Sequence, residues 1–344
     1  MNSTEISPGP APPPLDSLVK FIPPDHLWPI DSFWSYHAGR DTFDNLSIFT
    51  DALSRRYGVS SSAADYAKKA QAAAYESHRA MFEAYGRNKY TASGVIQWML
   101  QNAWPGMIWH LYDYYLRPGG SYFGAKNGLE PLHVQYSYAT KAIVIVNSTQ
   151  QSYSNLLVTA RVLNLDGTEK YAKSVVLGPL GPDAVMTAFT LPAISGLTST
   201  YFLRLTLSDA GNVVSQQTYW LSTRADTLNW NQSQWYVTPQ SQFADYTALA
   251  TLPPVNVTHS ERFVDEDGRT DAFVTVTNTS SAIAFFVHLK ITRGVGGEEL
   301  LPIRWQDNYL TLLPGESREI KGSYAIADLG GTIPVVSVDT YNGR

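Results

Sequence analysis

The clearest pattern in the chain is a helical one between Ser60 and Arg87. Alanine is dense there, and larger residues recur at steps of three and four, the spacing of one face of an α-helix. Ser60–Ser62 precede the repeat as candidate N-caps, and Gly86 stands near its end. The pattern predicts an amphipathic helix over residues 60–87. The proline run Pro10–Pro14, well before it, is typical of a linker or a disordered tail.

A short apolar segment, TASGVIQWML at 91–100, follows the predicted helix. Such a run between turn residues suits a buried parallel strand. A long helix that leads into this kind of strand, with a polar and aromatic loop behind it, is typical of a TIM barrel. Functional residues of that fold lie at the carboxyl ends of the strands, which is where Gln97, Asn102 and Trp104 fall.

Residues 94–138 concentrate aromatic side chains among a few amides and one carboxylate. Sugars present C–H faces that stack on aromatic planes, and their hydroxyls need placed donors and acceptors. The alternative is an aromatic-rich core strand and loop. Several of the aromatics adjoin turn residues such as Pro105 and Gly119, which favours a rim of loops around a site.

From about Lys141 onward the pattern changes to short alternating strands separated by turn dipeptides such as Asp166-Gly167. Regular short strands of this kind indicate an immunoglobulin-like β-sandwich. A polar and aromatic tract over 226–250 resembles a connector, and a second set of strands follows it. The acidic turn Asp265–Gly268 is predicted to close a hairpin, because it lacks the alternating ligands of a calcium loop.

Composition narrows the function without identifying it. Charged residues make up 16% of the chain and aromatic residues 12%. A net charge of -5 provides no electrostatic case for binding nucleic acid or an anionic membrane. The chain has no cysteine, which excludes disulfides and cysteine-bound metals. Seven histidines without metal-ligand spacing, His37 and His110 among them, predict no metal site, and no cofactor is expected.

Weak signals of location are also present. Six Asn-X-Ser/Thr sequons support an extracellular protein. No apolar run reaches the roughly 18 residues of a membrane span. Because the first residues lack the pattern of a signal peptide, a secreted protein would carry its signal outside this chain. We therefore expect the chain to be incomplete.

Three motifs resemble the C-terminal half of glycoside hydrolase family 2 enzymes, above all the exo-β-D-glucosaminidases, with endo-β-mannosidases as near relatives. They are NSTEISPGP at 2–10, the strand and loop at 94–138, and LPIRWQDNYLTLLPGE at 301–316. The resemblance implies the last two βα units of a TIM barrel at 1–138. An immunoglobulin-like β-sandwich at 139–225 and a connector with a second sandwich at 226–344 follow.

The resemblance also implies a role for Glu5, which matches the catalytic nucleophile of the family. Retaining glycosidases use two carboxyl groups about 5–5.5 Å apart, one as nucleophile and one as acid/base. In the family the acid/base residue and the groups that recognise the amine lie upstream, on a part that is absent here. The alternative for Glu5 is a solvated residue of a frayed terminus. Asp31, Asp41 and Asp44 are interpreted as caps or loop residues rather than as its partner.

Trp98, Asn102 and Trp104 are predicted to line the sugar subsite at the end of the last barrel strand. Core packing is the alternative for Trp98. Asp113 either hydrogen-bonds sugar hydroxyls or orders its loop. The predicted function is that of a retaining glycosidase fragment, inactive alone, which removes β-linked glucosamine from the non-reducing end of chitosan oligosaccharides. A β-mannoside hydrolase and a non-catalytic carbohydrate-binding or scaffold module are the alternatives.

Overall fold

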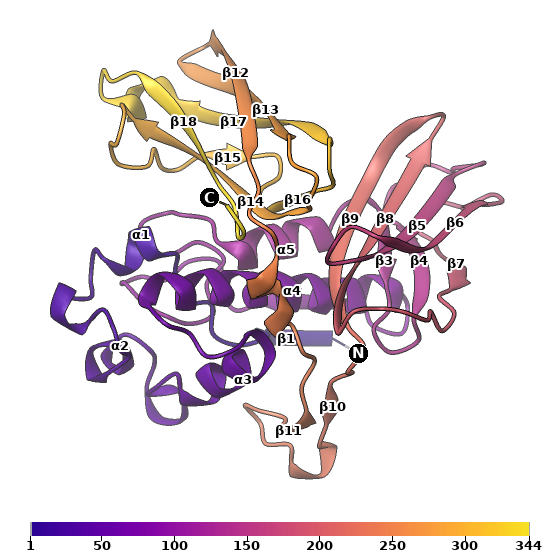
Figure 1. Ribbon diagram of the computed structural model, residues 1–344, viewed down its shortest axis with the longest axis horizontal. Helices are drawn as coiled ribbons and strands as arrows, with labels where there is room; N and C mark the ends of the chain where they lie inside the picture. Colours follow the sequence, from indigo (N-terminus) through magenta and orange to yellow (C-terminus); the bar gives the residue numbers. More distant parts are fainter. Residues whose placement is uncertain (1, 344) are drawn as a thin grey trace.

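The computed structural model describes residues 2–343, in three parts (Figure 1). A helical module carries the second β-sandwich above it and the first to its right, as drawn in Figure 1. The helical module contains α1 (Leu15–Leu18), η1 (Pro24–His26), α2 (Ser32–Tyr36), η2 (Asp41–Phe43), α3 (Ser47–Tyr57), α4 (Ala63–Arg87) and α5 (Gly120–Gly128).

Two parallel strands accompany these helices. β1 (Asn2–Ile6) and β2 (Gly94–Gln97) pair in parallel, with helices α1 to α4 between them in sequence. This confirms a strand in parallel pairing, but the predicted burial is wrong, because Ile96 of β2 is 62% exposed and no residue of β2 is fully buried. A TIM barrel closes over eight strands, so one pair does not by itself establish the predicted barrel.

Helix α4 confirms the helix that periodicity predicted. The Ser62 side chain caps it by accepting a hydrogen bond from the backbone N–H of Asp65 at 3.2 Å, and the helix ends before Asn88. The proline segment in front of it was predicted wrongly. Ala11 and Pro12 are buried, and the Pro12 carbonyl accepts a 2.6 Å hydrogen bond from Gln71 of α4. The prolines therefore pack on the helix instead of forming a free linker.

Helix α5 lies directly on α4 through three glycines. A Cβ atom at Gly120 would come within 2.2 Å of the Gln71 carbonyl oxygen, and one at Gly124 within 2.1 Å of the Tyr75 oxygen. At Gly128 the distance to the carbonyl of the next turn of α4 would be 3.0 Å. Both helices advance by four residues from one contact to the next, so they run in parallel with their backbones in contact.

The first sandwich packs a three-stranded sheet, β3-β4-β7, against a four-stranded one, β6-β5-β8-β9. It begins seven residues before the predicted boundary of 139, because β3 at Leu132 pairs with β4 and so belongs to this part. The predicted turn is confirmed by the positive φ of Gly167, 82°. The strands of the first sandwich are β3 (Leu132–Tyr136), β4 (Ala142–Asn147), β5 (Leu157–Asn164), β6 (Glu169–Val176), β7 (Val185–Thr190), β8 (Thr200–Asp209) and β9 (Asn212–Ser222).

The second sandwich contains the sheets β12-β13-β17-β15 and β16-β14-β18. The turn between β12 and β13 is a hairpin turn as predicted, with positive φ at Asp267 and Gly268. The connector before the sandwich holds β10 (Thr227–Leu228), η3 (Trp230–Gln232), β11 (Gln240–Gln242) and η4 (Thr247–Thr251). The sandwich itself comprises β12 (Val257–Glu266), β13 (Arg269–Asn278), β14 (Ala284–Arg293), β15 (Arg304–Trp305), β16 (Leu310–Leu312), β17 (Ser317–Ala325), η5 (Ile326–Leu329) and β18 (Pro334–Asp339).

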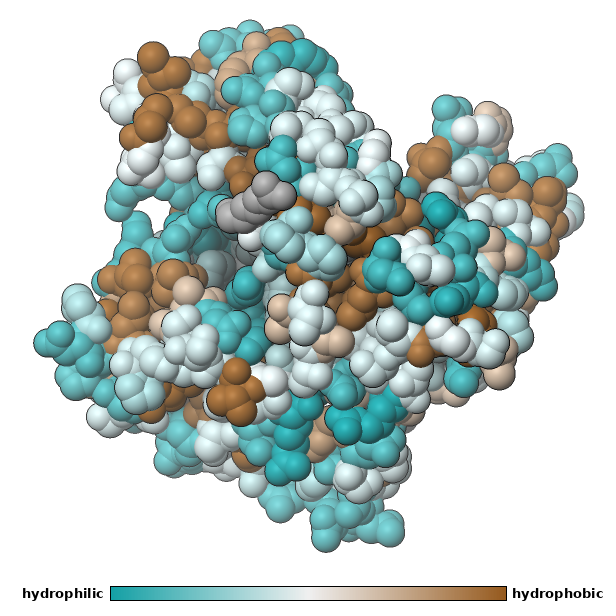
Figure 2. All heavy atoms as spheres, in the orientation of Figure 1, coloured by the Kyte–Doolittle hydropathy of each residue, from teal (hydrophilic) through white to brown (hydrophobic). Residues whose placement is uncertain are grey.

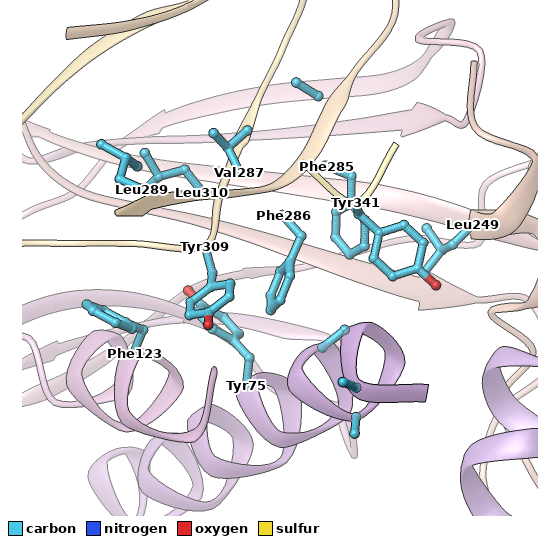
Figure 3. Packing of buried hydrophobic residues seen from close by; sticks show 14 of the residues in the cluster. Tyr75, Phe123, Leu249, Phe285, Phe286, Val287, Leu289, Tyr309, Leu310 and Tyr341 are labelled. Carbon is cyan, nitrogen blue, oxygen red and sulfur yellow. The ribbon is translucent and has the colours of Figure 1, made fainter. Parts of the chain in front are cut away.

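An aromatic core joins the helical module to the second sandwich. Tyr309 lies 4.6 Å from Phe286 and 5.8 Å from Phe123, measured between ring centroids. Figure 3 shows Tyr309 and Phe286 of the sandwich directed toward the helices that carry Phe123 and Tyr75. Because the largest buried cluster of the chain runs through this contact, the two parts form one continuous core.

A buried polar network joins the helical module to the first sandwich. His133 of β3 lies between two carboxylates, with Nε2 3.1 Å from Glu83 and Nδ1 2.9 Å from Glu130. Tyr219 also donates to Glu83, at 2.6 Å. Burial lowers the pKa of His133, but the bonds to Glu130 and Glu83 outweigh it and raise the pKa to about 9. His133 is therefore charged at neutral pH.

We expect Gly124→Ala to destabilise the chain, because the added methyl group would meet the Tyr75 carbonyl and force α4 and α5 apart. Overpacking of this kind costs about 1–3 kcal/mol. Gly86→Ala is the matched control: a Cβ there meets only Val146, at 3.9 Å, so the substitution should be neutral or stabilising. The measurement is the free energy of unfolding in urea. Equal effects of the two substitutions would contradict the close packing.

The His133 network predicts a stability that depends on pH. Histidine titrates near 6.5 in the unfolded chain and His133 near 9 in the folded one, so its contribution is complete below pH 6.5. The contribution is lost as pH rises through about 9. The difference between the folded and unfolded pKa values corresponds to about 3 kcal/mol of stability. Urea unfolding between pH 6.5 and 9.5 measures it. His133→Gln should remove this slope, and a flat profile in the wild type would contradict a charged His133.

Candidate active site

Glu5 and Trp98 lie at the same end of the parallel strand pair. Ile6 pairs with Gln97 in the register of β1 and β2, and the N–H of Trp98 donates to the Ile6 carbonyl at 3.0 Å. Glu5 is exposed, and its side chain makes no hydrogen bond or ion pair with any residue from 5 to 343. The predicted nucleophile is thus held by a strand at the carboxyl end of the sheet, not by a frayed segment.

Gln97 holds the backbone behind this end of the strands. Its Nε2 donates to the carbonyl oxygens of Trp98 and Trp109, both at 3.0 Å. The N–H of Met99 donates to the same Trp109 carbonyl at 2.7 Å. Two donors on one carbonyl tie the end of β2 to the loop that carries Trp109. Gln97 therefore positions the backbone rather than facing solvent.

Trp98 and Trp104 lie at the surface. Trp98 is 47% exposed and Trp104 43%, so core packing, the alternative for Trp98, does not describe its place. Trp104 stacks on His37 with ring centroids 4.9 Å apart, and the Tyr36 ring lies nearly perpendicular to Trp104 at 5.5 Å. We call Tyr36, His37 and Trp104 the Trp104 platform. His37, for which the sequence predicted no metal role, thus takes part in ring stacking.

Asn102 lies below the surface rather than on it. It is 4% exposed, and its Nδ2 donates to the Ile108 carbonyl at 3.2 Å and to Nδ1 of His110 at 2.6 Å. Burial lowers the pKa of His110 to about 3, which keeps the ring neutral and lets Nδ1 accept. Through these hydrogen bonds Asn102 holds the loop beneath Trp104 in place. This differs from the predicted place in direct contact with sugar.

Asp113 is also buried, at 2% exposure. Its Oδ1 accepts from the backbone N–H groups of Tyr115 at 2.9 Å and Arg117 at 3.0 Å, and its Oδ2 accepts from the Ser17 hydroxyl. Of the two roles considered for Asp113, the geometry is that of ordering its loop. The predicted substrate contact would need an exposed carboxylate, which the structure does not provide.

The acidic residues Asp31 and Asp44, considered as partners of Glu5, instead make local hydrogen bonds that order their own segments. Asp31 caps α2 by accepting from the N–H of Phe33 at 2.9 Å, as interpreted from the sequence. Asp44 accepts from the Asn45 amide at 2.5 Å. Within residues 2–343 no group of three His, Cys, Asp or Glu side chains is placed to hold a metal ion. In the same range no helix is long and apolar enough to cross a membrane.

Several known proteins and one family model are similar to this chain. An exo-β-D-glucosaminidase Ig-fold domain matches residues 235–343. The exo-β-D-glucosaminidase of Amycolatopsis orientalis is 42% identical, over 99% of this chain and 34% of the relative. That of Streptomyces avermitilis is 43% identical, over 99% and 39%. The chain is a homologue of part of the exo-β-D-glucosaminidases of glycoside hydrolase family 2. The resemblance carried by the three sequence motifs is thereby confirmed.

The crystal structure of the exo-chitosanase CsxA from Amycolatopsis orientalis matches with a TM-score of 0.94 and 40% identity, over 99% of this chain and 42% of that chain. A mannosylglycoprotein endo-β-mannosidase of Lilium longiflorum is more distant, at 24% identity. The chain spans well under half the length of the exo-β-D-glucosaminidases it matches, 34% and 39%.

We expect Asn102→Ala to loosen the loop below the Trp104 platform. The substitution leaves the Ile108 carbonyl and Nδ1 of His110 without their donor, and an unsatisfied buried polar group costs about 1–3 kcal/mol. Urea unfolding measures the loss. Gln101→Ala, at the exposed neighbouring position, is the control and should stay within about 0.5 kcal/mol of wild type. Similar stability of the two variants would show that Asn102 does not support the loop.

Proposed function

We propose that the chain is the C-terminal part of a retaining glycoside hydrolase that removes β-linked glucosamine from the non-reducing end of chitosan oligosaccharides. The observation that carries the proposal is the position of Glu5. An exposed carboxylate stands at the carboxyl end of β1, where β2 leads into the exposed rings of Trp98 and Trp104. Identity above 40% to two exo-β-D-glucosaminidases supports the amino sugar as substrate.

In this proposal the Glu5 carboxylate attacks the anomeric carbon and expels the leaving group, so that a glycosyl ester forms on Glu5. A second carboxyl group protonates the departing oxygen, and then takes a proton from the water that hydrolyses the ester. Trp98 and the Trp104 platform stack against the C–H face of the sugar. β1, β2 and their helices would be the last two units of a TIM barrel.

The second carboxyl group is assigned to a part of the protein outside this chain. Asp31, Asp44 and Asp113 are each engaged by backbone or neighbouring side chains, so none is proposed as the partner of Glu5. Further domains upstream and an extracellular location belong to the same proposal, the latter supported by the sequons. The chain alone is therefore proposed to be catalytically inactive.

A β-mannoside hydrolase is the second candidate, because an endo-β-mannosidase is a distant relative at 24% identity. It is favoured less than glucosaminidase, since the similarity to exo-β-D-glucosaminidases is much greater. A carbohydrate-binding module without catalysis would share the exposed aromatic rings, and it is separated from both enzymes by the role of Glu5.

A hybrid enzyme tests the proposal. The homologous segment of the Amycolatopsis orientalis enzyme is replaced by this chain, and release of p-nitrophenol from β-D-glucosaminide and β-D-mannoside is measured. We expect activity on the glucosaminide, and Glu5→Gln should lower it about a thousandfold or more, as loss of a nucleophile does. Glu261→Gln, at another exposed glutamate, is the matched control and should leave the rate unchanged.

The outcomes separate the three candidates. A folded hybrid that cleaves only the mannoside would favour the second candidate, and one without either activity would favour a binding module. Activity that persists in Glu5→Gln would show that the nucleophile is misassigned. Turnover by the 344-residue chain alone, abolished by Glu5→Gln, would contradict an external acid/base group.

A further inference from the structure

The connector between the two sandwiches carries a hairpin of unusual composition. Residues 227–242 run from β10 to β11, whose strands pair in antiparallel fashion, at the bottom of Figure 1. No residue of this segment is charged, although 16% of the chain is. Its surface in Figure 2 is mainly teal to white. Amides are frequent in it: Asn229, Asn231, Gln232, Gln234, Gln240 and Gln242.

Two tryptophans of the hairpin are left in solvent. Trp235 is 80% exposed and Trp230 70%, more than any other tryptophan within residues 2–343. Tryptophan is largely buried in most proteins, so a pair held open on one hairpin indicates a binding surface. The backbone is fixed locally by hydrogen bonds from Asn229 to the Pro239 carbonyl at 2.8 Å and from Gln234 to that of Val237 at 2.8 Å.

The amide side chains of the hairpin are available to a ligand. Gln242 donates to the Ala225 carbonyl at 2.6 Å. Within residues 2–343, the side chains of the other five make no hydrogen bond. Uncharged donors and acceptors next to exposed aromatic faces are the groups that bind sugar hydroxyls and C–H faces. A nucleic acid or an anionic membrane would instead need basic residues, of which the segment has none.

The hairpin is connected to the candidate active site through Phe43. This ring contacts Trp235 at 5.5 Å and Tyr236 at 6.0 Å in the hairpin, and also Trp109 at 4.9 Å. Trp109 is the residue whose carbonyl accepts from Gln97 and Met99 at the end of β2. A continuous line of rings therefore runs from the strand end to the hairpin.

We propose that the 227–242 hairpin is a second sugar-binding platform, which holds the units of an amino-sugar oligomer that lie beyond its terminal unit. Trp235 supplies the main stacking face and Trp230 a second one. The ammonium group of glucosamine adds attraction to the face of either ring. This inference rests on the proposed function, in which the terminal unit occupies the Glu5 end near Trp98.

The test compares binding of glucosamine and of its β-1,4-linked tetramer by calorimetry. The 344-residue chain is produced in a bacterial host, so that the sequon at Asn231 carries no glycan. We expect Trp235→Ala to weaken tetramer binding about tenfold and to leave glucosamine binding unchanged, since about 1.4 kcal/mol of stacking is lost. The tetramer affinity of Trp235→Phe should lie between that of the wild type and that of Trp235→Ala. Ile333→Ala, at another exposed apolar position, is the control.

Equal tetramer affinity in wild type and in a folded Trp235→Ala variant would overturn the platform. So would a wild-type chain that does not bind the tetramer, or a loss that is the same for both probes. Each of these results concerns the hairpin alone. A hybrid enzyme whose activity depends on Glu5 would still support the proposed function, whereas an inactive hybrid with tetramer binding at Trp235 would overturn that function and retain the platform.

Discussion

Besides Lys69, helix α4 carries three buried charged side chains, and the placement of the other parts depends on the partners of these three. Glu76, Arg79 and Glu83 are 5%, 1% and 0% exposed, and their spacing places them on one side of the helix. A buried charge that loses its partner is left uncompensated, which destabilises the folded chain. The partners come from different elements: Tyr246 of the connector for Glu76, Thr218 and Tyr219 of β9 for Arg79, and His133 of β3 for Glu83. One helix thereby orients the connector and the first sandwich together.

This dependence explains which features could be predicted from the sequence. Helix α4 and most strands of the sandwiches follow local periodicity, and a turn such as that at Gly167 depends on its own residues. Burial of Pro12 could not be predicted in that way, because its carbonyl meets Gln71, a residue far along the chain. The start of β3 was missed for a similar reason: LHVQY carries no turn signal that separates it from the aromatic loop.

In the candidate site, too, some features could be predicted from the sequence and others could not. Its aromatic character could be predicted from composition, and Trp98 and Trp104 do lie at the surface. The polar residues between them could not be assigned, since an Asn or Asp in a loop binds a ligand and orders a backbone with the same groups. Asn102 and Asp113 both order the backbone of their loops. His37 had no signal of its own, because its stacking on Trp104 joins segments that are distant in sequence.

The contact between α4 and α5 has a consequence for how this protein evolves. A side chain that becomes too large can usually be accommodated when a neighbouring side chain becomes smaller. Gly120 and Gly124 face backbone carbonyls, which no substitution in α4 can shorten. A change of side chain in α4 therefore cannot compensate for a larger residue at Gly120 or Gly124, and the interface restricts both positions to glycine. The parts of the chain most resistant to change need not be those that touch a substrate.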